Sequence, residues 1–367
     1  MKTIEWWNSK IQKKEAIKSV NRVLISGSIS TGHTTNILEK KLQSFLSVKH
    51  AIAVSSGSMA TLLAFMALDI KSGDEIIIPS IGWISVINAC KIIGAKPVIA
   101  DTCKNKKIIS FDSAKKAISK KTKCIFLINM NGRKIELESF KKICDKKKIY
   151  LIEDSAQALG VKYKKKFCGT NSTLGIFSMS ITKLLTSGQG GFLVTNNSNL
   201  AKKIYYMRRH GFSDIKNIRN WNKYGGNFKI SDMQSALALT QLKVIKKKFK
   251  QNTKNFKIIS QKLSSYKKFI EPSCININKG EIPLYNEFKA LRIPQLTKFL
   301  KQKKIETRLV SPTFEKVSYM PIEISKSGLK NAIIYDKKYF YLPSGPDLKI
   351  SEINRFVDEI KKFYDQE

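Results

Sequence analysis

Short apolar segments alternate with helical segments through the first half of this chain, and no other feature constrains its fold as strongly. The segments with the length and composition of strands are residues 50–54, 75–79, 97–101, 124–128, 149–154, 175–179 and 191–195. A helical pattern precedes the first of them, at residues 36–47, and others lie between them, at residues 59–68 and 84–93. Strands that alternate with helices build a mostly parallel sheet covered on both faces. We therefore predict an α/β fold with a mostly parallel central sheet.

The pattern changes beyond residue 245. Lysine-rich helical segments, a less regular stretch over residues 272–283 and a final amphipathic helix from Ser351 follow there. A chain of 367 residues is long enough for two domains. We expect a large domain over residues 1–245 and a smaller C-terminal domain over residues 246–367.

The formal net charge of +39 has two interpretations. One is a surface that binds nucleic acid or a membrane. The other is a compositional bias toward lysine, isoleucine and asparagine. The lysines are spread along the chain without a basic tract interleaved with aromatic residues, which favours the second interpretation. We expect no nucleic-acid partner, although a basic surface would favour an anionic substrate.

Cysteine and histidine usage argues against a metal centre and a disulfide framework. The six cysteines form no CxxC pair, and the three histidines have no metal-ligand spacing. No apolar run approaches the roughly 18 residues of a membrane span. The N-terminal residues lack an apolar signal region. The sequence predicts no metal, no membrane span and a cytoplasmic location.

Two of the predicted strands end at residues that could bind a ligand. The segment 55–60 joins a strand to a helix through serines and a glycine, an arrangement that points backbone amides at an anion such as a phosphate. Taken alone, a serine-glycine turn before a helix is more often an ordinary helix cap. Asp154 ends the apolar strand at 149–154, where an acid often faces a ligand crevice. Its alternative role is the N-cap of the residues that follow.

Lys183 stands between the strand that carries Ser178 and a glycine-rich turn at residues 188–191. In a chain so rich in lysine, a solvated surface lysine is the simplest interpretation. A lysine held near a buried acid, however, is what pyridoxal phosphate (PLP) chemistry requires, because the acid keeps the pyridine nitrogen protonated. The order of phosphate turn, acid, hydroxyl, lysine and glycine turn therefore indicates a PLP site.

Further segments carry a resemblance over nearly the whole chain. They are residues 56–58, 73–80, 153–157, 182–191 and 226–236, together with Gly27, Gly32 and Glu39. In these segments the chain resembles the DegT/DnrJ/EryC1/StrS family of PLP-dependent nucleotide-sugar aminotransferases. The resemblance implies the fold-type-I aminotransferase architecture, with a large domain around the mostly parallel sheet and a smaller C-terminal α+β domain.

The resemblance also implies roles around the cofactor ring. Lys183 would form the Schiff base with PLP and carry the proton between Cα and C4′. Asp154 would pair with the pyridinium nitrogen, and Gln157 would approach the 3-hydroxyl side of the ring. Trp83 would stack on the ring, although a buried tryptophan is also common in an ordinary core.

Another set of matching positions would bind the phosphate of PLP. These are Ser58, the amide of Met59 and Ser178, with Asn227 reaching the same phosphate from a neighbouring subunit. The resemblance therefore implies a homodimer whose active site is shared between subunits.

Some positions depart from the family pattern near the substrate. Lys229 stands where arginine is common, and it cannot make a bidentate phosphate contact. Asn129 and Asn131 stand where histidine and tyrosine are frequent. Arg308, within a Glu-Thr-Arg sequence, is expected to contact the sugar nucleotide. Arg308, Asn129 and Lys229 are therefore the candidate substrate residues.

Together these features predict an aminotransferase. Its expected substrates are a nucleotide-diphosphate keto-sugar, of the 4-keto-6-deoxy type, and L-glutamate as amino donor. PLP would pass through pyridoxamine phosphate, and the amino-sugar nucleotide would serve surface polysaccharide or glycoconjugate synthesis. One alternative is a pyridoxamine-phosphate-dependent sugar dehydratase of the same family, which often has histidine at the position of Lys183. A second is a regulatory or nucleic-acid-binding protein that reuses the fold.

Overall fold

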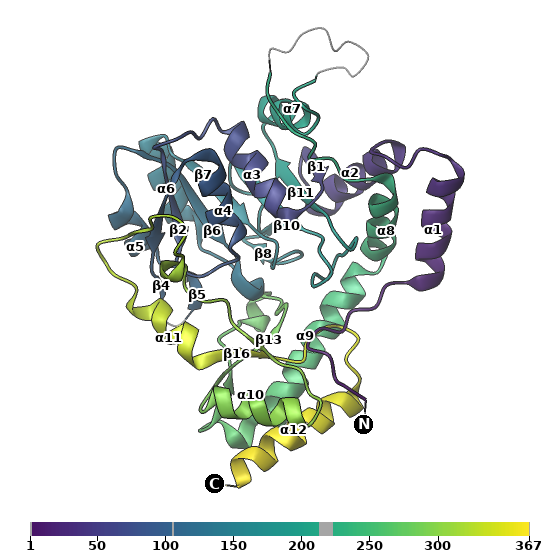
Figure 1. Ribbon diagram of the computed structural model, residues 1–367, viewed down its shortest axis with the longest axis vertical. Helices are drawn as coiled ribbons and strands as arrows, with labels where there is room; N and C mark the ends of the chain where they lie inside the picture. Colours follow the sequence, from purple (N-terminus) through teal and green to yellow (C-terminus); the bar gives the residue numbers. More distant parts are fainter. Residues whose placement is uncertain (1, 105, 213–222, 367) are drawn as a thin grey trace.

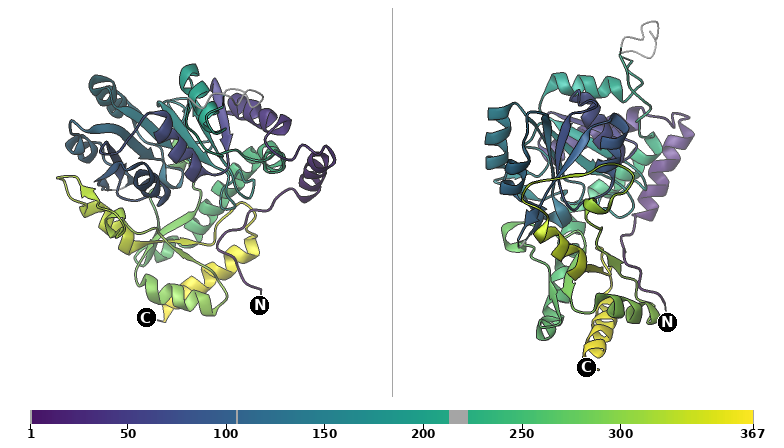
Figure 2. Two further views of the ribbon diagram at one scale, coloured as in Figure 1. Left: turned by 45° about the horizontal axis from the view of Figure 1, so that its top comes forward. Right: turned by 60° about the vertical axis from the view of Figure 1, so that its left-hand side comes forward.

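A computed structural model describes residues 2–104, 106–212 and 223–366. An eight-stranded sheet with its helices forms the larger part of the molecule (Figure 1). A four-stranded sheet lies with α9 (Ile245–Lys262), α10 (Ile293–Gln302) and α12 (Ile350–Asp365) at the opposite end. Both chain ends lie at this smaller end of the molecule (Figure 2).

The large sheet is mostly parallel. Its strands lie in the order β1 (His50–Val54), β11 (Gly191–Thr195), β10 (Leu174–Ser178), β7 (Tyr150–Asp154), β6 (Thr122–Ile128), β2 (Glu75–Pro79), β3 (Lys96–Ala100) and β15 (Glu323–Ile324). Strand β11 runs antiparallel to both neighbours, and the other pairs are parallel. The predicted α/β fold with a mostly parallel central sheet is confirmed.

Strand β2 illustrates why the strands of this sheet are continuously apolar. Ile76 and Ile78 pack in one core cluster with residues of α3 (Gly57–Ala67) and α4 (Ser85–Ile93). Ile77 points to the other face, where α5 (Phe111–Ala117) and α6 (Leu137–Lys147) supply the cluster. Both faces are buried, so the strand needs apolar side chains at every position.

Other helices also belong to the larger part. Among them are α2 (His33–Leu46), α7 (Ser198–Met207) and α8 (Asp232–Lys243). The carboxylate of Asp232, at the start of α8, accepts hydrogen bonds from the backbone N–H groups of Gly32, Thr34 and Thr35 at the start of α2. Helix α1 (Lys13–Ile25) lies beside α8 at the edge of the molecule (Figure 1).

The small sheet is antiparallel throughout. Its strands lie in the order β12 (Ile270–Pro272), β13 (Asn286–Ala290), β16 (Tyr339–Leu342) and β14 (Arg308–Leu309). Phe288 and Phe340 of this sheet share a core with Leu296 of α10 and with Phe356 and Ile360 of α12. The apolar residues of α12 recur every three or four positions, so one face of the helix covers the sheet.

The N-terminal segment and a segment of the C-terminal part connect the two sheets. Ile4 bridges to Ile305, and Trp7 bridges to Ser344. Strand β15 and α11 (Lys330–Lys338) return from the C-terminal part to the large sheet, where Ala332 and Tyr335 join its core. The domain boundary at residues 245 and 246 stays a prediction, and these connections cross it.

Two short antiparallel strand pairs lie outside the two main sheets. These pairs are β4 (Thr102–Cys103) with β5 (Lys106–Ile109), and β8 (Lys162–Tyr163) with β9 (Lys166–Phe167). Across the described ranges, no helix has both the length and the apolar character needed to cross a lipid bilayer.

Candidate active site

A cavity of about 300 Å³ lies at the carboxyl ends of β6, β7 and β10. This is where ligands bind in open α/β sheets. Segments of the small sheet and of the N-terminus close the cavity from the other side. The predicted residues that line it are Ser58, Trp83, Asp154, Gln157, Ser178, Lys183 and Arg308.

Asp154 ends β7 and presents its carboxylate to the cavity. Its Oδ1 accepts a hydrogen bond of 2.9 Å from the backbone N–H of Ala156. Burial raises the pKa of Asp154 to about 6, although the Ala156 hydrogen bond and the charge of Lys183 act in the opposite direction. A carboxylate that is desolvated in this way favours a cationic partner.

Lys183 lies in the loop after β10 and is half-buried in the cavity wall. Its backbone N–H donates to the carbonyl of Ser180 over 3.0 Å. The Nζ atom lies 5.9 Å from the centroid of the Tyr285 ring. The loop itself is anchored at Ile181, whose carbonyl accepts a 3.0 Å hydrogen bond from Nε1 of Trp7. The loop therefore places the lysine amine in the same cavity as Asp154.

The start of α3 and the end of β10 form the end of the cavity suited to an anion. Gly57 begins α3, and Ser58 and Ser178 present hydroxyl groups. A Cβ on Gly57 would lie 2.9 Å from the Cβ of Ser178, so glycine is required for this close approach. The Met59 amide donates to Oγ of the N-cap Ser56 over 3.1 Å, and Met59 does not line the cavity. The first amides of the helix and its dipole favour a phosphate here.

Gln157 lines the cavity, whereas the two asparagines predicted near the substrate lie beneath it. Asn129 is fully buried, and its Oδ1 accepts a 2.8 Å hydrogen bond from Oγ of Ser155. Its backbone N–H donates to the carbonyl of Asp154 over 2.9 Å. Asn131 is also fully buried, and its backbone N–H donates to Oε1 of Gln157. Asn129 can therefore act on a substrate only through its neighbours.

Arg308 and two tryptophans form the mouth of the cavity. The guanidinium carbon of Arg308 lies 4.7 Å from the ring centroid of Trp6 and 5.8 Å from that of Trp83. Trp83 is 53% exposed, unlike a core tryptophan. A half-buried cation flanked by aromatic rings suits a large anionic substrate.

Asn227 and Lys229 lie outside the cavity lining. Asn227 is exposed and forms an isolated bridge with Arg209. Lys229 is half-buried in the segment that leads to α8.

Several lining residues were not predicted from the sequence. Among them are Trp6, Ser180, Tyr285 and Tyr341. Trp6 and Tyr285 lie 5.7 Å apart between ring centroids, although 279 residues separate them in the chain (285 − 6). The adjacent pair Trp6 and Trp7, in an otherwise polar N-terminal segment, is the one sequence signal that points to this wall.

Metal ligands do not gather in the structure. Within residues 2–104, 106–212 and 223–366, no group of three histidine, cysteine or acidic side chains could hold a metal ion. The cavity instead joins a carboxylate, an amine and an anion-binding helix start, the arrangement that a phosphorylated pyridine cofactor needs.

A family comparison agrees with this geometry. The model of the DegT/DnrJ/EryC1/StrS aminotransferase family matches residues 10–361. The chain belongs to this family. Family membership confirms the predicted resemblance and the prediction of an aminotransferase-type enzyme.

Solved structures share the fold. A DegT DnrJ EryC1 StrS aminotransferase from Brucella abortus has a TM-score of 0.90 at 20% identity, covering 96% of this chain and 95% of that chain. Helicobacter pylori PseC, an aminotransferase involved in the biosynthesis of pseudoaminic acid, has a TM-score of 0.90 at 24% identity, with 100% of each chain covered. The E. coli GDP-4-keto-6-deoxy-D-mannose-3-dehydratase, solved with bound hydrated PLP, has a TM-score of 0.88 at 23% identity, with 98% and 100% covered.

These structures have the same fold as this chain, and one of them contains PLP. The fold-type-I architecture predicted for this DegT/DnrJ/EryC1/StrS family member is confirmed. The hydrated PLP of the E. coli dehydratase agrees with the predicted cofactor. The solved structures that share this fold include both an aminotransferase and a dehydratase.

Proposed function

We propose that this protein is a PLP-dependent aminotransferase that moves an amino group from L-glutamate to a nucleotide-linked keto-sugar of the 4-keto-6-deoxy type. The observation that carries the proposal is the convergence of Asp154, at the end of β7, with Ser178 and Lys183, at the end of β10 and in the loop that follows it, on one cavity. The product would be an amino-sugar nucleotide for polysaccharide or glycoconjugate synthesis.

The cavity residues fit PLP. When bound, PLP supplies an electron sink that lets an amino acid lose its Cα proton. Asp154 would hold the pyridine nitrogen as a cation, and Trp83 would cover one face of the ring. Ser58, Ser178 and the start of α3 would hold the phosphate.

Lys183 would act as the general base and acid. Its amine would take the proton from Cα of the donor and deliver it to C4′ of the cofactor, and the same transfer in reverse would serve the keto-sugar. The flexible four-carbon stem of a lysine can reach both atoms from one backbone position. The loop hydrogen bonds of Ser180 and Ile181 would hold that position.

Arg308 would bind the anionic nucleotide sugar at the mouth of the cavity. Its guanidinium group carries a permanent charge that suits a diphosphate. Asn129 and Lys229 were also predicted to contact substrate; both lie outside the lining of the cavity in this chain. We therefore keep Arg308 as the direct contact and propose that Asn129 acts through Asp154 and Ser155.

We further propose that the enzyme is a homodimer in which Asn227 reaches the phosphate of the partner subunit. Asn227 is exposed and does not line the cavity of its own subunit, which is compatible with that role. Exposed apolar side chains, among them Ile25 (86%), Ile181 (56%) and Tyr224 (59%), would be covered by a second copy. A cytoplasmic location, where nucleotide sugars and L-glutamate are both available, is part of the proposal.

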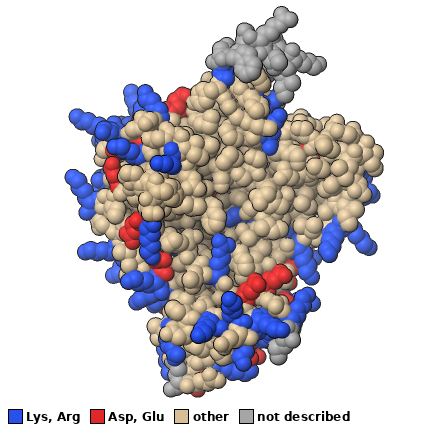
Figure 3. Space-filling view, in the orientation of Figure 1, with Lys and Arg blue, Asp and Glu red and all other residues tan. Residues whose placement is uncertain are grey.

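Two alternatives carry less support. A sugar dehydratase of this family would require a pyridoxamine-phosphate-dependent reaction without the lysine, whereas Lys183 is present and lines the cavity. A nucleic-acid-binding role would require a concentrated basic surface. On the face drawn in Figure 3, lysine and arginine side chains lie in several separate areas, with acidic side chains among them.

The test is a reaction with ¹⁵N-labelled L-glutamate and a small panel of nucleoside-diphosphate keto-sugars. Mass spectrometry should find the label in an amino-sugar nucleotide. Release of a deoxygenated keto-sugar without the label would favour the dehydratase. If no member of the panel changes and the protein does not bind PLP, the proposed function is wrong.

A further inference from the structure

The amide of Gln157 has a defined orientation in the cavity wall. The backbone N–H of Asn131 donates to Oε1 of Gln157 over 2.8 Å. A backbone N–H needs an acceptor, so the carbonyl end of the amide faces Asn131. The Nε2 end has no hydrogen-bond partner among the described residues, and Gln157 lines the cavity. Gln157 therefore offers a hydrogen-bond donor to whatever occupies the cavity.

Asn131 adopts an unusual backbone conformation to make this contact. Its φ and ψ are 48° and 42°, in the left-handed region that asparagine tolerates better than most residues. Gly132 follows with φ of 75°, and a Cβ there would lie 1.6 Å from the carbonyl oxygen of Ile282. The turn after β6 is thus packed directly against the segment that leads into β13.

The side chain of Asn131 uses its full hydrogen-bonding capacity to hold this turn. Its Oδ1 accepts from the backbone N–H groups of Leu284 (3.0 Å) and Tyr285 (2.7 Å). Its Nδ2 donates to the carbonyl of Tyr285 and to Oε2 of Glu287, both at 3.1 Å. A fully satisfied buried amide specifies one geometry, because any shift leaves a polar group unpaired.

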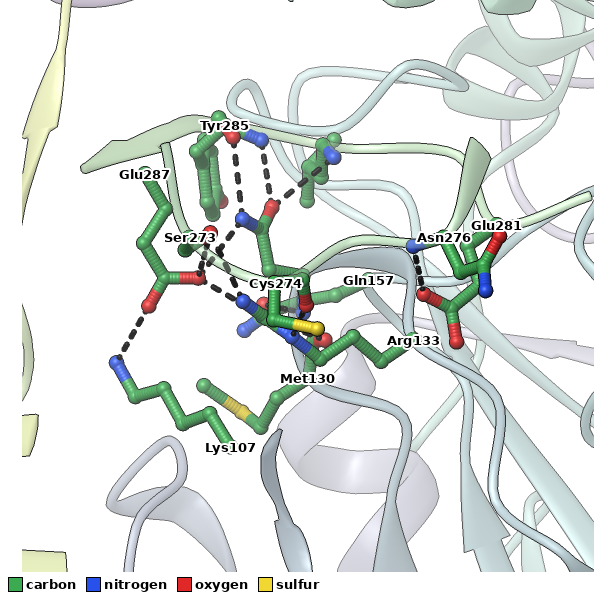
Figure 4. Close-up of polar contacts among 12 residues, drawn as sticks. Lys107, Met130, Arg133, Gln157, Ser273, Cys274, Asn276, Glu281, Tyr285 and Glu287 are labelled. Atoms are coloured by element: carbon green, nitrogen blue, oxygen red, sulfur yellow. Dashed lines mark hydrogen bonds and ion pairs between the residues drawn. The ribbon is translucent and has the colours of Figure 1, made fainter. Parts of the chain in front are cut away.

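Glu287 fixes the other end of this network. Its carboxylate is fully buried and lies 2.8 Å from Nη1 of Arg133 and 3.3 Å from Nζ of Lys107 (Figure 4). Burial alone would raise the pKa of Glu287, but Arg133 and then Lys107 lower it to about 2. Lys107 and Arg133 belong to the larger part of the molecule, and Glu287 belongs to the small sheet. The ion pairs therefore connect the two parts of the molecule close to Gln157.

We propose that Asn131, held by Glu287, is a positioning residue that fixes Gln157 as a hydrogen-bond donor to the 3-oxygen of PLP. The inference rests on the cofactor of the proposed function. A donor at this oxygen withdraws negative charge from it and lowers the proton affinity of the bound cofactor. Asn131 does not line the cavity and acts only through the orientation of Gln157.

The test compares two buried asparagines that hold the same segment. Asn131→Gly keeps the left-handed backbone accessible but removes the side chain. Asn252→Ala is the matched control, because Nδ2 of Asn252 donates to the carbonyls of Pro283 and Leu284 without touching Asn131 or Gln157. The readouts are the dissociation constant of PLP and the pH midpoint of the absorbance change of bound PLP, with no sugar or glutamate present.

Asn131→Gly should weaken PLP binding about tenfold and raise the pH midpoint by about one pH unit, whereas Asn252→Ala should lower thermal stability and leave both readouts unchanged. In a Gln157→Ala background, Asn131→Gly should cause no further shift of the midpoint. If Asn131→Gly does not fold, Asn131→Asp serves instead. This variant keeps the Oδ1 acceptor but replaces the Nδ2 group that donates to Glu287 with a second oxygen.

A wild-type midpoint in folded Asn131→Gly or Asn131→Asp would overturn the proposal. An equal shift with and without Gln157 would also overturn it, because Asn131 would then act by another route. These outcomes concern a protein that binds PLP, whereas failure of the wild type to bind PLP would contradict the proposed function itself.

Discussion

The guanidinium carbon of Arg308 lies 4.7 Å from the ring centroid of Trp6, so the N-terminal segment stacks on the candidate substrate residue. This contact is fixed by neighbouring hydrogen bonds. The backbone N–H of Trp6 donates to Oε2 of Glu306 over 3.2 Å, and the N–H of Glu306 donates to the carbonyl of Ile4 over 2.9 Å. The first residues of the chain therefore help to shape the mouth of the active site.

Trp6→Ala should weaken binding of the nucleotide sugar. A cation–π contact contributes about 1 kcal/mol, so we expect the KM for the keto-sugar nucleotide to rise about fivefold with little change in kcat. Steady-state kinetics measure both constants. Trp6→Phe is the control and should keep most of the affinity. An unchanged KM in Trp6→Ala would show that the ring does not support Arg308.

Asp154 should destabilise the cofactor-free fold at neutral pH. Its folded-state pKa of about 6 lies above its ordinary value of 3.8, so the ionised form is disfavoured by folding and stability falls as pH rises from about 4 to 6. The apoprotein of Asp154→Asn should exceed the wild type in stability by up to about 3 kcal/mol at pH 7.5 and by about 1 kcal/mol at pH 4.5. Urea unfolding at both pH values measures the difference. A difference independent of pH would contradict this assignment.

Glu287 should have the opposite effect on stability. Its pKa of about 2 lies below the ordinary value of 4.5, so its ionised form stabilises the fold above pH 4.5, and this contribution is lost as pH falls through about 2. Glu287→Gln leaves two buried cations without their counter-charge and should cost about 3 kcal/mol at pH 6. The cost should shrink by about 1 kcal/mol at pH 3.5.

Chemical denaturation of the wild type and of Glu287→Gln at pH 6 and at pH 3.5 measures the loss of stability. Glu271→Gln is a suitable control, because Glu271 forms a partly exposed ion pair with Lys289 on the same small sheet. It should change stability by less than about 1 kcal/mol. If Glu287→Gln and Glu271→Gln lower the free energy of unfolding equally, the buried ion pairs of Glu287 do not stabilise the fold more than a partly exposed pair does.

The shared active site can be tested by mixing two inactive variants. If Asn227 serves the partner's cofactor, a hybrid of Lys183→Ala and Asn227→Ala subunits contains one complete site. An equal mixture should recover about a quarter of the wild-type activity after subunit exchange. Variants that stay inactive together, although they exchange subunits, would place Asn227 in the site of its own subunit or outside it.

The sequence predicted the larger sheet more accurately than the rest of the fold. Each of its first seven strands lies within two residues of the predicted segment, because strands buried on both faces are apolar at every position. The family resemblance implied a smaller α+β domain, but the strands of the small sheet were not located from the sequence pattern. Strand β13 carries Asn286, Glu287 and Lys289 among its five residues, and its polar side chains pair with distant partners that local pattern does not reveal.

Some residues of the candidate site could be predicted from the sequence, and others could not. Asp154, Ser178 and Lys183 lie at the ends of local strand patterns and could be named from the sequence. Tyr285 and Trp6 reach the cavity only through long-range packing, so their roles depend on the fold. Asn131 stands out in the sequence as a departure from the family pattern, but its buried contacts with Gln157 and Glu287 required the structure.

The central claim is that Lys183 and PLP together exchange amino groups. The most direct measurement is the visible absorbance spectrum of the purified protein during addition of L-glutamate and then of a keto-sugar nucleotide. The account predicts that glutamate bleaches the cofactor band of the wild type, that the correct keto-sugar restores it, and that Lys183→Ala shows neither change. A cofactor band in the wild type that does not respond to amino donors, or a Lys183→Ala variant that responds as the wild type does, would contradict it.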